Sequence, residues 1–398
     1  MNRREKHGGN GMKTRRPISI NNSLSHGICN YNCTLCGVNK KTYKGPKEFQ
    51  PKELTEKLIA RIEEAARQGL RVRYVANAGD GEPTLHPDFG ARMDLFGAMI
   101  RRWNAPNVPA PEVSVVSNGF RLLSPGVLDA IVRNDLTLIV SFPTPNPEAY
   151  GQIMTGNPEN GRHLLDQVVQ GLQKAFKLLA EGHLKKMQFH ISPPDRDIVR
   201  RDFNKTVHFL TTLANEAGVK DIEMVLFPAT SNRSGLIRNR TKGLDLYKDF
   251  FQAYRRWNRH NGVLVSLKLS YQRFFPHFKE FLDLLRSFNY PCTWNSQIFL
   301  TAQGDSICCN DQAVRNPLGN LTSHTLVELM EEKEAYLPGR VCAGCDQSPR
   351  HMSGSFRSAL FGWLAQRKLA WTKARTPECD SGRKCLAALH LEPVHADH

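Results

Sequence analysis

The feature that most constrains this chain is an alternation of short apolar runs with amphipathic helical patterns over its first 230 residues. The segment at 51–69 repeats Leu and Ile at helical spacing and ends at a glycine, whereas 136–145 contains the compact apolar run LTLIV. Short apolar strands joined by helical crossovers form parallel sheets. The pattern therefore predicts an α/β fold, as a doubly wound sheet or an incomplete barrel. The predicted strands lie at 16–21, 71–79, 112–119, 136–145, 186–194 and 221–230.

Polar and reactive residues follow most of these predicted strands. In a parallel sheet, the loops at the carboxyl ends of the strands meet along one edge, and that edge carries the chemistry of such folds. A cysteine-rich loop follows the first strand, GDGEPTL the second, SNG the third, SFP the fourth and TSNRSG the sixth. We therefore expect these loops to build one site.

The cysteine-rich loop, GICNYNCTLCGV, holds Cys29, Cys33 and Cys36. Three thiols cannot all pair as disulfides, and the polar, basic N-terminus lacks the apolar core of a signal peptide. A reducing, cytoplasmic setting is therefore predicted. Zinc would need a fourth ligand, for which His26 is a candidate. An iron–sulfur cluster on three cysteines would instead leave one iron open to a chelating ligand.

The spacing C-x3-C-x2-C resembles the signature of the radical S-adenosylmethionine (radical SAM) superfamily. The resemblance implies a partial (β/α)6 TIM-like barrel in which Cys29, Cys33 and Cys36 hold a [4Fe–4S] cluster with an open iron site. It also implies that S-adenosylmethionine binds this iron and is cleaved reductively to a 5′-deoxyadenosyl radical. The residue before the third cysteine is commonly aromatic in the family. It is Leu35 here, which would still offer adenine an apolar contact.

A second motif strengthens this interpretation. AGDGEPTLHP resembles the GGEP element of the superfamily, carried here by Gly81, Glu82 and Pro83. Glycines let a backbone approach a ligand closely, and exposed carbonyls accept hydrogen bonds from an ammonium group. The resemblance also implies that polar residues of the later loops contact the cofactor or line its cavity. These are Ser117, Asn118, Ser141, Asn232 and Arg233, each of which also suits an ordinary turn.

The remaining seven cysteines lie from residue 292 onward. Cys292, Gly304 and Cys309, followed by a C-x2-C pair, suit a zinc ribbon or a complete cluster. The arrangement resembles the start of the SPASM domain and its shortened Twitch form. It implies an auxiliary [4Fe–4S] cluster on Cys292, Cys309, Cys342 and Cys345. The C-x5-C-x3-C run of a full SPASM domain does not follow, which favours the Twitch form.

Three further cysteines have alternative interpretations. Cys379 and Cys385 would ligate a second auxiliary cluster or be surface thiols. Cys308 is a candidate catalytic residue, as a hydrogen-atom donor to a substrate radical, or a buried neighbour of a ligand.

Four parts of the chain follow from these patterns. A basic flexible tail spans 1–15, a radical SAM core domain 16–285, and a small α+β Twitch-like domain 286–347. The third part begins with a hairpin predicted at 297–309 and includes a helix with Leu326, Leu329 and Met330 on its apolar face. The last part, 348–398, is a basic helical tail, which we expect to dock on the core rather than on a membrane or RNA.

The predicted function is that of a radical SAM oxidoreductase. An auxiliary cluster saturated by cysteines suits electron transfer, so it would oxidise the substrate radical in a dehydrogenation or crosslinking reaction. The alternatives are a redox-neutral epimerase or mutase, and a non-catalytic iron–sulfur or zinc sensor that binds RNA. Candidate bases near strand ends are His86, His190, Asp80 and Glu223.

The predicted partners follow from charge and chemistry. The formal net charge of +16 favours an anionic group on the metabolite or peptide substrate. A low-potential electron donor such as flavodoxin or ferredoxin is expected, and a nucleic acid is a less favoured partner. No run of about 18 apolar residues occurs, so no membrane span is predicted.

Overall fold

The computed structural model describes residues 17–33, 36, 45–105, 107–191, 196–226, 259–269, 297–307 and 317–336. The strands are β1 (Ile18–Ser23), β2 (Ser25–His26), β3 (Glu48–Phe49), β4 (Val72–Ala78), β5 (Glu112–Ser117), β6 (Thr137–Ser141), β7 (Lys186–Ile191), β8 (Asp221–Leu226), β9 (Arg259–His260), β10 (Val263–Leu269), β11 (Gln297–Leu300), β12 (Asp305–Ile307) and β13 (Gly319–Asn320). The α-helices are α1 (Lys52–Arg67), α2 (Phe89–Arg101), α3 (Val127–Arg133), α4 (Pro147–Thr155), α5 (Gly161–Ala180), α6 (Arg196–Glu216) and α9 (Leu326–Tyr336), with short 3₁₀ helices η1 (Pro83–Leu85) and η2 (Pro158–Asn160).

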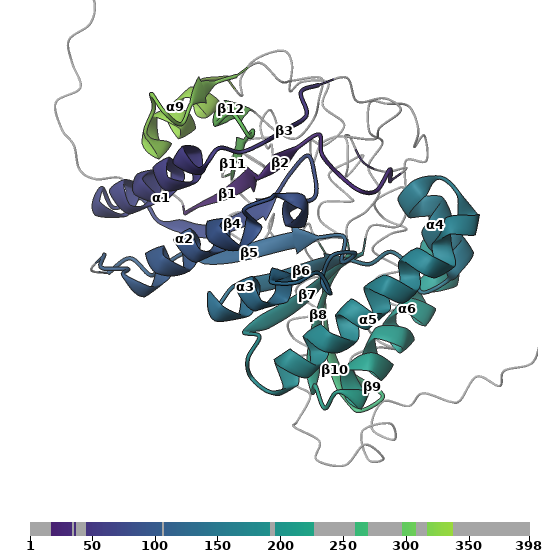
Figure 1. Cartoon of the computed structure of the whole chain (residues 1–398). Coiled ribbons are helices and arrows are strands. Elements are labelled where there is room, and N and C mark those ends of the chain that lie inside the picture. The colour runs from purple at the N-terminus through teal and green to yellow at the C-terminus, as the bar shows by residue number, and fades with distance from the viewer. Residues whose placement is uncertain are drawn as a thin grey trace, which may run out of the picture.

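One large sheet organises these elements (Figure 1). Its order is β13-β12-β11-β1-β4-β5-β6-β7-β8-β10-β9, and β2 pairs separately with β3. The six predicted strands are β1, β4, β5, β6, β7 and β8, which are neighbours in chain order and all parallel. The predicted α/β fold with a parallel sheet is therefore confirmed, and the arrangement is consistent with a partial TIM barrel.

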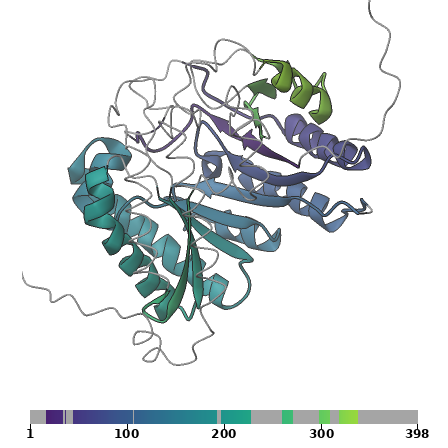
Figure 2. The same ribbon diagram turned by 180° about the vertical axis from the view of Figure 1, so that it is seen from behind.

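The hydrophobic core lies between the sheet and the helices that cover it (Figure 1, Figure 2). Leu58 and Ile62 of α1 are fully buried, as their helical spacing predicts. Leu138 and Val140, two residues apart on β6, are also fully buried in this core. Burying a side chain of this kind contributes roughly 1.5–3 kcal/mol. This layer therefore fixes the strands from which the loops emerge.

Two helices differ from the sequence prediction. α4 was not predicted, although the Asn146 side chain caps its first turn and Gly156, with φ of 74°, ends it. Its nine residues are too few for a clear apolar period. For α3, the sequence SPGVLDAIVRN predicts a helix that Ser124 caps. It begins instead at Val127 after Gly126, whose φ is 79°, so Ser124 lies outside the helix.

The C-terminal hairpin is confirmed in its described part. β11 and β12 pair antiparallel around Gly304, whose φ is 82°. In α9, Leu326, Leu329 and Met330 are buried, as their helical spacing predicts. β11 also pairs in parallel with β1, so this segment belongs to the same sheet as the N-terminal strands. The domain boundary predicted near residue 285 lies outside the described residues and stays a prediction.

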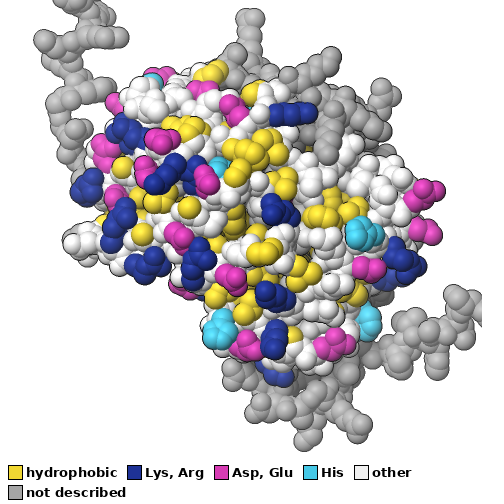
Figure 3. All heavy atoms as spheres, viewed as in Figure 1, with side chains coloured by type: hydrophobic (Ala, Val, Ile, Leu, Met, Phe, Trp, Pro, Cys, Tyr) yellow, Lys and Arg dark blue, Asp and Glu magenta, His cyan; other side chains and the backbone are white. Residues whose placement is uncertain are grey.

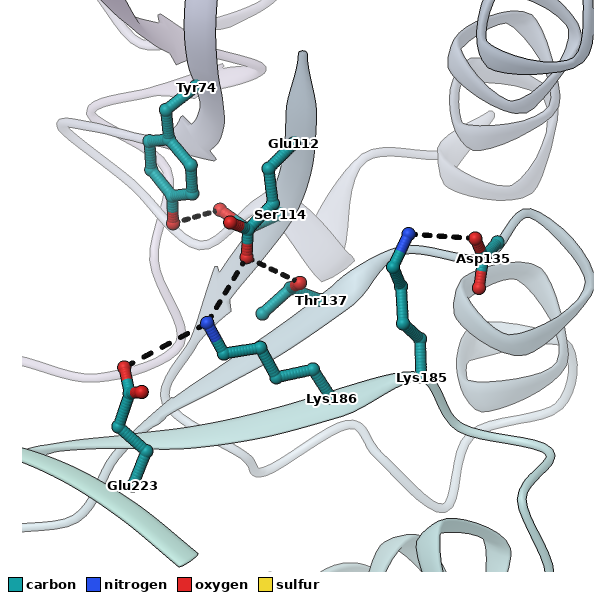
Figure 4. A network of polar contacts seen from close by, with 8 residues as sticks. All are labelled: Tyr74, Glu112, Ser114, Asp135, Thr137, Lys185, Lys186 and Glu223. Atoms are coloured by element: carbon teal, nitrogen blue, oxygen red, sulfur yellow. Dashed lines mark hydrogen bonds and ion pairs between the residues drawn. The ribbon is translucent and has the colours of Figure 1, made fainter. Parts of the chain in front are cut away.

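Polar side chains link the amino-terminal parts of four neighbouring strands (Figure 4). The Glu112 carboxylate on β5 accepts a hydrogen bond from the Thr137 hydroxyl on β6 at 2.9 Å. The same carboxylate lies 3.4 Å from the Lys186 ammonium on β7, which is 3.9 Å from the Glu223 carboxylate on β8. These contacts lie at the end of the strands opposite to the cysteine-rich loop, where they connect β5 to β8.

Replacing Lys186 by Met is expected to lower the free energy of unfolding by at most about 1 kcal/mol, because exposed ion pairs contribute little. Its side chain is 38% exposed. The loss should shrink as salt is added, since salt screens the pairs in the parent. Urea denaturation at two salt concentrations measures both effects. Lys185→Met is the matched control, because Lys185 makes one exposed pair with Asp135. An equal loss of stability in the Lys185→Met control would show that the two linked ion pairs of Lys186 stabilise the protein no more than one isolated pair does.

Candidate active site

The cysteine-rich loop directly follows β1 and β2. Cys29, Cys33 and Cys36 form no disulfide among the described residues and are of intermediate burial. The Asn32 N–H donates to the Met154 carbonyl of α4 at 2.9 Å, and the sulfurs of Cys33 and Met154 are 3.7 Å apart. The helix that the sequence did not predict therefore holds the middle of this loop.

Aromatic side chains form an apolar wall beside the thiols. Tyr31 is buried, and its ring lies 5.7 Å from Phe120 and 6.5 Å from Tyr150, edge to face in both cases. Burial raises the pKa of both tyrosines, so both phenols stay neutral. The Tyr31 backbone N–H donates to the Cys29 sulfur at 3.4 Å. Cys29 and Cys33 thus pack against an apolar surface on this side of the loop.

The three thiols lie close enough to affect one another. Burial raises the pKa of Cys33 well above that of a free thiol, and the neighbouring Cys36 and Cys29 raise it further. A bound cationic metal offsets this crowding, because metals take thiolates as ligands. Within the described ranges, no group of three or more His, Cys, Asp or Glu side chains is placed to hold a single metal ion. Three neighbouring thiols suit a [4Fe–4S] cubane, whose cysteines bind separate irons, and zinc with His26 as a fourth ligand stays the alternative.

The loop after β4 packs directly against the cysteine-rich loop. The Glu82 N–H donates to the Ile28 carbonyl at 2.9 Å. A Cβ atom at Gly81 would stand 1.7 Å from the Ser25 carbonyl oxygen and 2.7 Å from that of Ile28. Only glycine permits this approach, which gives the GEP element a physical reason independent of any ligand.

The Glu82 side chain ties the loop after β4 to the loop after β5. Its carboxylate is buried and accepts hydrogen bonds from the Thr84 N–H at 3.2 Å and hydroxyl at 2.6 Å. It also accepts from the Ser117 hydroxyl and the Asn118 N–H, both at 2.8 Å. Burial raises the pKa of Glu82, and these hydrogen bonds oppose the shift. The carboxylate is therefore committed to contacts within the protein.

The loop after β5 reaches the cysteine-rich loop through Asn118. Its side-chain amide nitrogen lies 2.8 Å from Asn30 Oδ1 and 3.9 Å from the Cys29 sulfur. Its Oδ1 accepts the Phe120 N–H at 3.0 Å. The loops after β1, β4 and β5 therefore meet, as expected for neighbouring parallel strands.

The sequence of this region matches one family model. Residues 24–185 match the model described as the radical SAM superfamily. The matched range runs from just after β1 to just before β7 and includes the three cysteines and the GEP loop. These residues form a radical SAM domain. All the loop contacts described above lie within this radical SAM domain.

Solved structures also share the fold of this chain. Native anSMEcpe with bound AdoMet is 15% identical with a TM-score of 0.57, over 90% of this chain and 98% of that one. SuiB of Streptococcus suis bound to the precursor peptide SuiA is 13% identical with a TM-score of 0.56, over 82% of this chain and 66% of that one. This chain thus spans just under two thirds of SuiB. Such identities establish a shared fold, and no curated protein sequence matches the chain.

The other predicted site residues divide into two groups. Pro83 is buried at the start of η1, and Ser141 ends β6 with an intermediate exposure. Their cofactor contacts stay predictions. The second group lies outside the described residues and comprises Leu35, Asn232, Arg233, Cys292, Cys308, Cys309, Cys342, Cys345, Cys379 and Cys385.

Sequence reasoning missed three residues that shape the site. Asn30 and Tyr31 lie between the first two cysteines, where the spacing pattern treats any residue as equivalent. Met154 lies on the unpredicted α4, and its contact with Cys33 is a long-range feature that no local pattern could reveal. The sequence offered one signal for Asn30, its position beside a cysteine of the predicted cluster motif.

Two candidate bases have structural roles. The buried His86 accepts the Asp88 N–H on Nδ1 at 3.0 Å, so its Nε2 carries the proton and donates to the Gln50 carbonyl at 3.0 Å. Burial lowers the pKa of His86, so the ring stays neutral. Glu223 lies in the network of Figure 4, at the other end of the strands from the cysteine-rich loop. Neither observation supports a role as base.

The surface gives limited information on partners. None of the helices in the described part of the chain is both long and apolar enough to cross a membrane. On the face seen in Figure 3, Lys and Arg side chains are interspersed with Asp and Glu. The net charge of +16 is therefore not gathered into one patch on that face.

Proposed function

We propose that this protein is a radical SAM oxidoreductase that cleaves S-adenosylmethionine and oxidises a peptide or small-molecule substrate. The observation that carries the proposal is the meeting of three crowded thiols with the GEP loop inside a radical SAM domain. Neither feature alone would support the proposal, because a tight turn could account for Gly81 and a zinc site could account for the three thiols. Their direct contact through Ile28 and Glu82 favours a single site.

The cofactors would be a [4Fe–4S] cluster on Cys29, Cys33 and Cys36, and S-adenosylmethionine on its open iron. When bound, they supply a 5′-deoxyadenosyl radical, formed together with methionine by one-electron reduction, that removes a hydrogen atom from substrate. The chain would enclose this chemistry with the aromatic wall and with the backbone of the GEP loop. The further proposed contacts are Leu35, Gly81, Glu82, Pro83, Ser117, Asn118, Ser141, Asn232 and Arg233.

The oxidative outcome rests on an auxiliary [4Fe–4S] cluster in a Twitch-like domain. Its proposed ligands are Cys292, Cys309, Cys342 and Cys345. Support comes from the hairpin, because Cys292 lies five residues before β11 and Cys309 two residues after β12. Since β11 pairs with β1, the hairpin belongs to the same sheet as β1, the strand that leads into the cysteine-rich loop. Such a cluster would accept an electron from the substrate radical.

A peptide is the favoured substrate class. Two solved structures that share the fold contain a peptide: SuiB bound to the precursor peptide SuiA, and anSMEcpe with the Kp18Cys peptide. The basic net charge suits an acidic peptide, although a small anionic metabolite would suit it equally. A flavodoxin or ferredoxin would supply the electron, and a cytoplasmic location would protect the cluster from oxidation.

The deciding experiment is S-adenosylmethionine cleavage by anaerobically reconstituted protein. With dithionite, we expect 5′-deoxyadenosine and methionine in equal amounts, measured by liquid chromatography with mass spectrometry. Omitting dithionite should abolish both products, because the cleavage consumes an electron. Cluster-loaded protein that releases neither product under reduction would contradict the proposal and leave the sensor alternative. Once a substrate is found, solvent deuterium at a recovered carbon would instead indicate the redox-neutral epimerase.

A further inference from the structure

The amide of Asn118 can adopt only one orientation. Its Oδ1 accepts the N–H of Phe120 at 3.0 Å, and a backbone N–H can only donate. The NH2 group must therefore face the opposite side, toward Asn30 Oδ1 at 2.8 Å and the Cys29 sulfur at 3.9 Å. Asn118 is only 8% exposed, so water competes little for these donors. An oriented amide dipole thus points its positive end at one of the proposed cluster ligands.

The buried Glu82 carboxylate holds the backbone of Asn118 in this place. The Asn118 N–H donates to Glu82 Oε2 at 2.8 Å, while the Thr84 and Ser117 donors bind Oε1. Because one oxygen serves Asn118 alone, the position of Asn118 depends on that oxygen. The Glu82 N–H in turn binds the Ile28 carbonyl, next to Cys29. The backbone N–H and the side-chain carboxylate of Glu82 therefore both hold groups that lie next to Cys29.

Asn30 provides an independent sign of a missing acceptor. Its Oδ1 accepts from Asn118, whereas its own Nδ2 is buried with no hydrogen-bond partner in the described structure. An unsatisfied buried donor destabilises the folded state. Native proteins rarely leave such a group without an acceptor. The amide lies next to Cys29, where a cluster or its ligand would provide that acceptor.

We propose that Asn118, held in place by Glu82, is a positioning residue for the cluster. The side-chain amide of Asn118 orients Asn30 and donates an N–H···S hydrogen bond to the Cys29 ligand. This bond would raise the reduction potential of the cluster. The physical reason is that donors to ligand sulfur stabilise the reduced state, which carries one more negative charge. The inference rests on the function proposed above, because it needs a cluster on Cys29.

The test is the midpoint potential of the cluster in the Asn118→Leu variant, measured by electron paramagnetic resonance in a redox titration. Leu fills similar volume but cannot donate. At a fixed potential, the ratio of reduced to oxidised cluster should fall about tenfold, which is 59 mV for a one-electron couple. The matched control is Asn77→Leu. Asn77 is also buried, and its amide binds the Asn22 side chain and the Ser114 carbonyl instead of the cysteine-rich loop. The control should lose stability without changing the potential.

Two further variants keep the test decisive. Asn118→Ala retains the backbone bond to Glu82 and should lower the potential even if the Leu variant does not fold. Glu82→Gln separates positioning from charge: loss of the buried charge alone would raise the potential, whereas displacement of Asn118 would lower it. A raised potential overturns the role of Glu82. An unchanged potential in the Asn118 variants overturns the inference and leaves the proposed function intact, whereas a parent protein that binds no cluster removes both.

Discussion

Replacing Cys29, Cys33 and Cys36 together by Ala is expected to abolish 5′-deoxyadenosine release. The variant should also lose about four iron atoms per chain, because a [4Fe–4S] cubane holds four irons, which alternate with four sulfides at its corners. Cys29, Cys33 and Cys36 are the only cysteines among the described residues, and Ala offers no ligand in their place. Iron and sulfide analysis with Mössbauer spectroscopy on reconstituted protein measures the loss. If the variant retains a [4Fe–4S] signal, the C-terminal cysteines bind iron and the oxidative reaction gains support.

The matched control for this variant is Cys379→Ala with Cys385→Ala. These cysteines are not among the proposed ligands of the radical SAM domain, so cleavage of S-adenosylmethionine should persist. A triple variant that binds zinc but no iron would contradict the auxiliary cluster and favour a single-cluster, redox-neutral enzyme. Loss of cleavage in the control would indicate that these distant cysteines contribute to the active centre.

Replacing Gly81 by Ala is expected to have the second largest effect. The added Cβ would stand 1.7 Å from the Ser25 carbonyl oxygen, which is backbone and cannot rotate away. Relieving this overlap requires the cysteine-rich loop and the GEP loop to separate, at a cost of about 1–3 kcal/mol or more. The bond from Glu82 to Ile28 should break as well. Chemical denaturation measures the loss of stability, and iron content measures the loss of the cluster.

Gly90→Ala is the control for a methyl group added elsewhere in the domain. Gly90 lies in α2, and its Cβ would meet Arg133 Nη2 at 3.4 Å, which is ordinary contact. Alanine is the better helix former by about 1 kcal/mol, so this variant should be at least as stable as the parent. If Gly81→Ala unfolds at the same denaturant concentration as the parent, the two loops do not need their close approach.

The parallel sheet and the edge that bears the site could be predicted from sequence, because strand and helix periods are local. The run LTLIV and the helix at 51–69 each carry their own signal. The meeting of the cysteine-rich loop with the GEP loop followed from the order of the strands. α4 escaped prediction because it is short and lies in a segment rich in Pro and Asn.

The interior of the site could not be predicted. A sequence motif identifies Glu82 and Asn118 as polar residues in loops, but it does not show which atoms they contact. The structure commits the Glu82 carboxylate to Ser117 and Asn118, and the Asn118 amide to Asn30. These contacts join residues 35 to 88 positions apart in the chain, and only tertiary packing determines them.

The place of β11 beside β1 has a consequence for how the chain folds. β1 pairs with β4 soon after both are synthesised, but its other edge is matched only by residues 297–300. At typical rates of synthesis of about 5–20 residues per second, roughly 10–45 seconds pass between the synthesis of β4 and that of β11. The second edge of β1 stays open during that time. An open strand edge invites pairing with other chains. β1 therefore leaves the ribosome well before the strand that completes its second edge, and protecting that edge in the nascent chain would favour efficient folding.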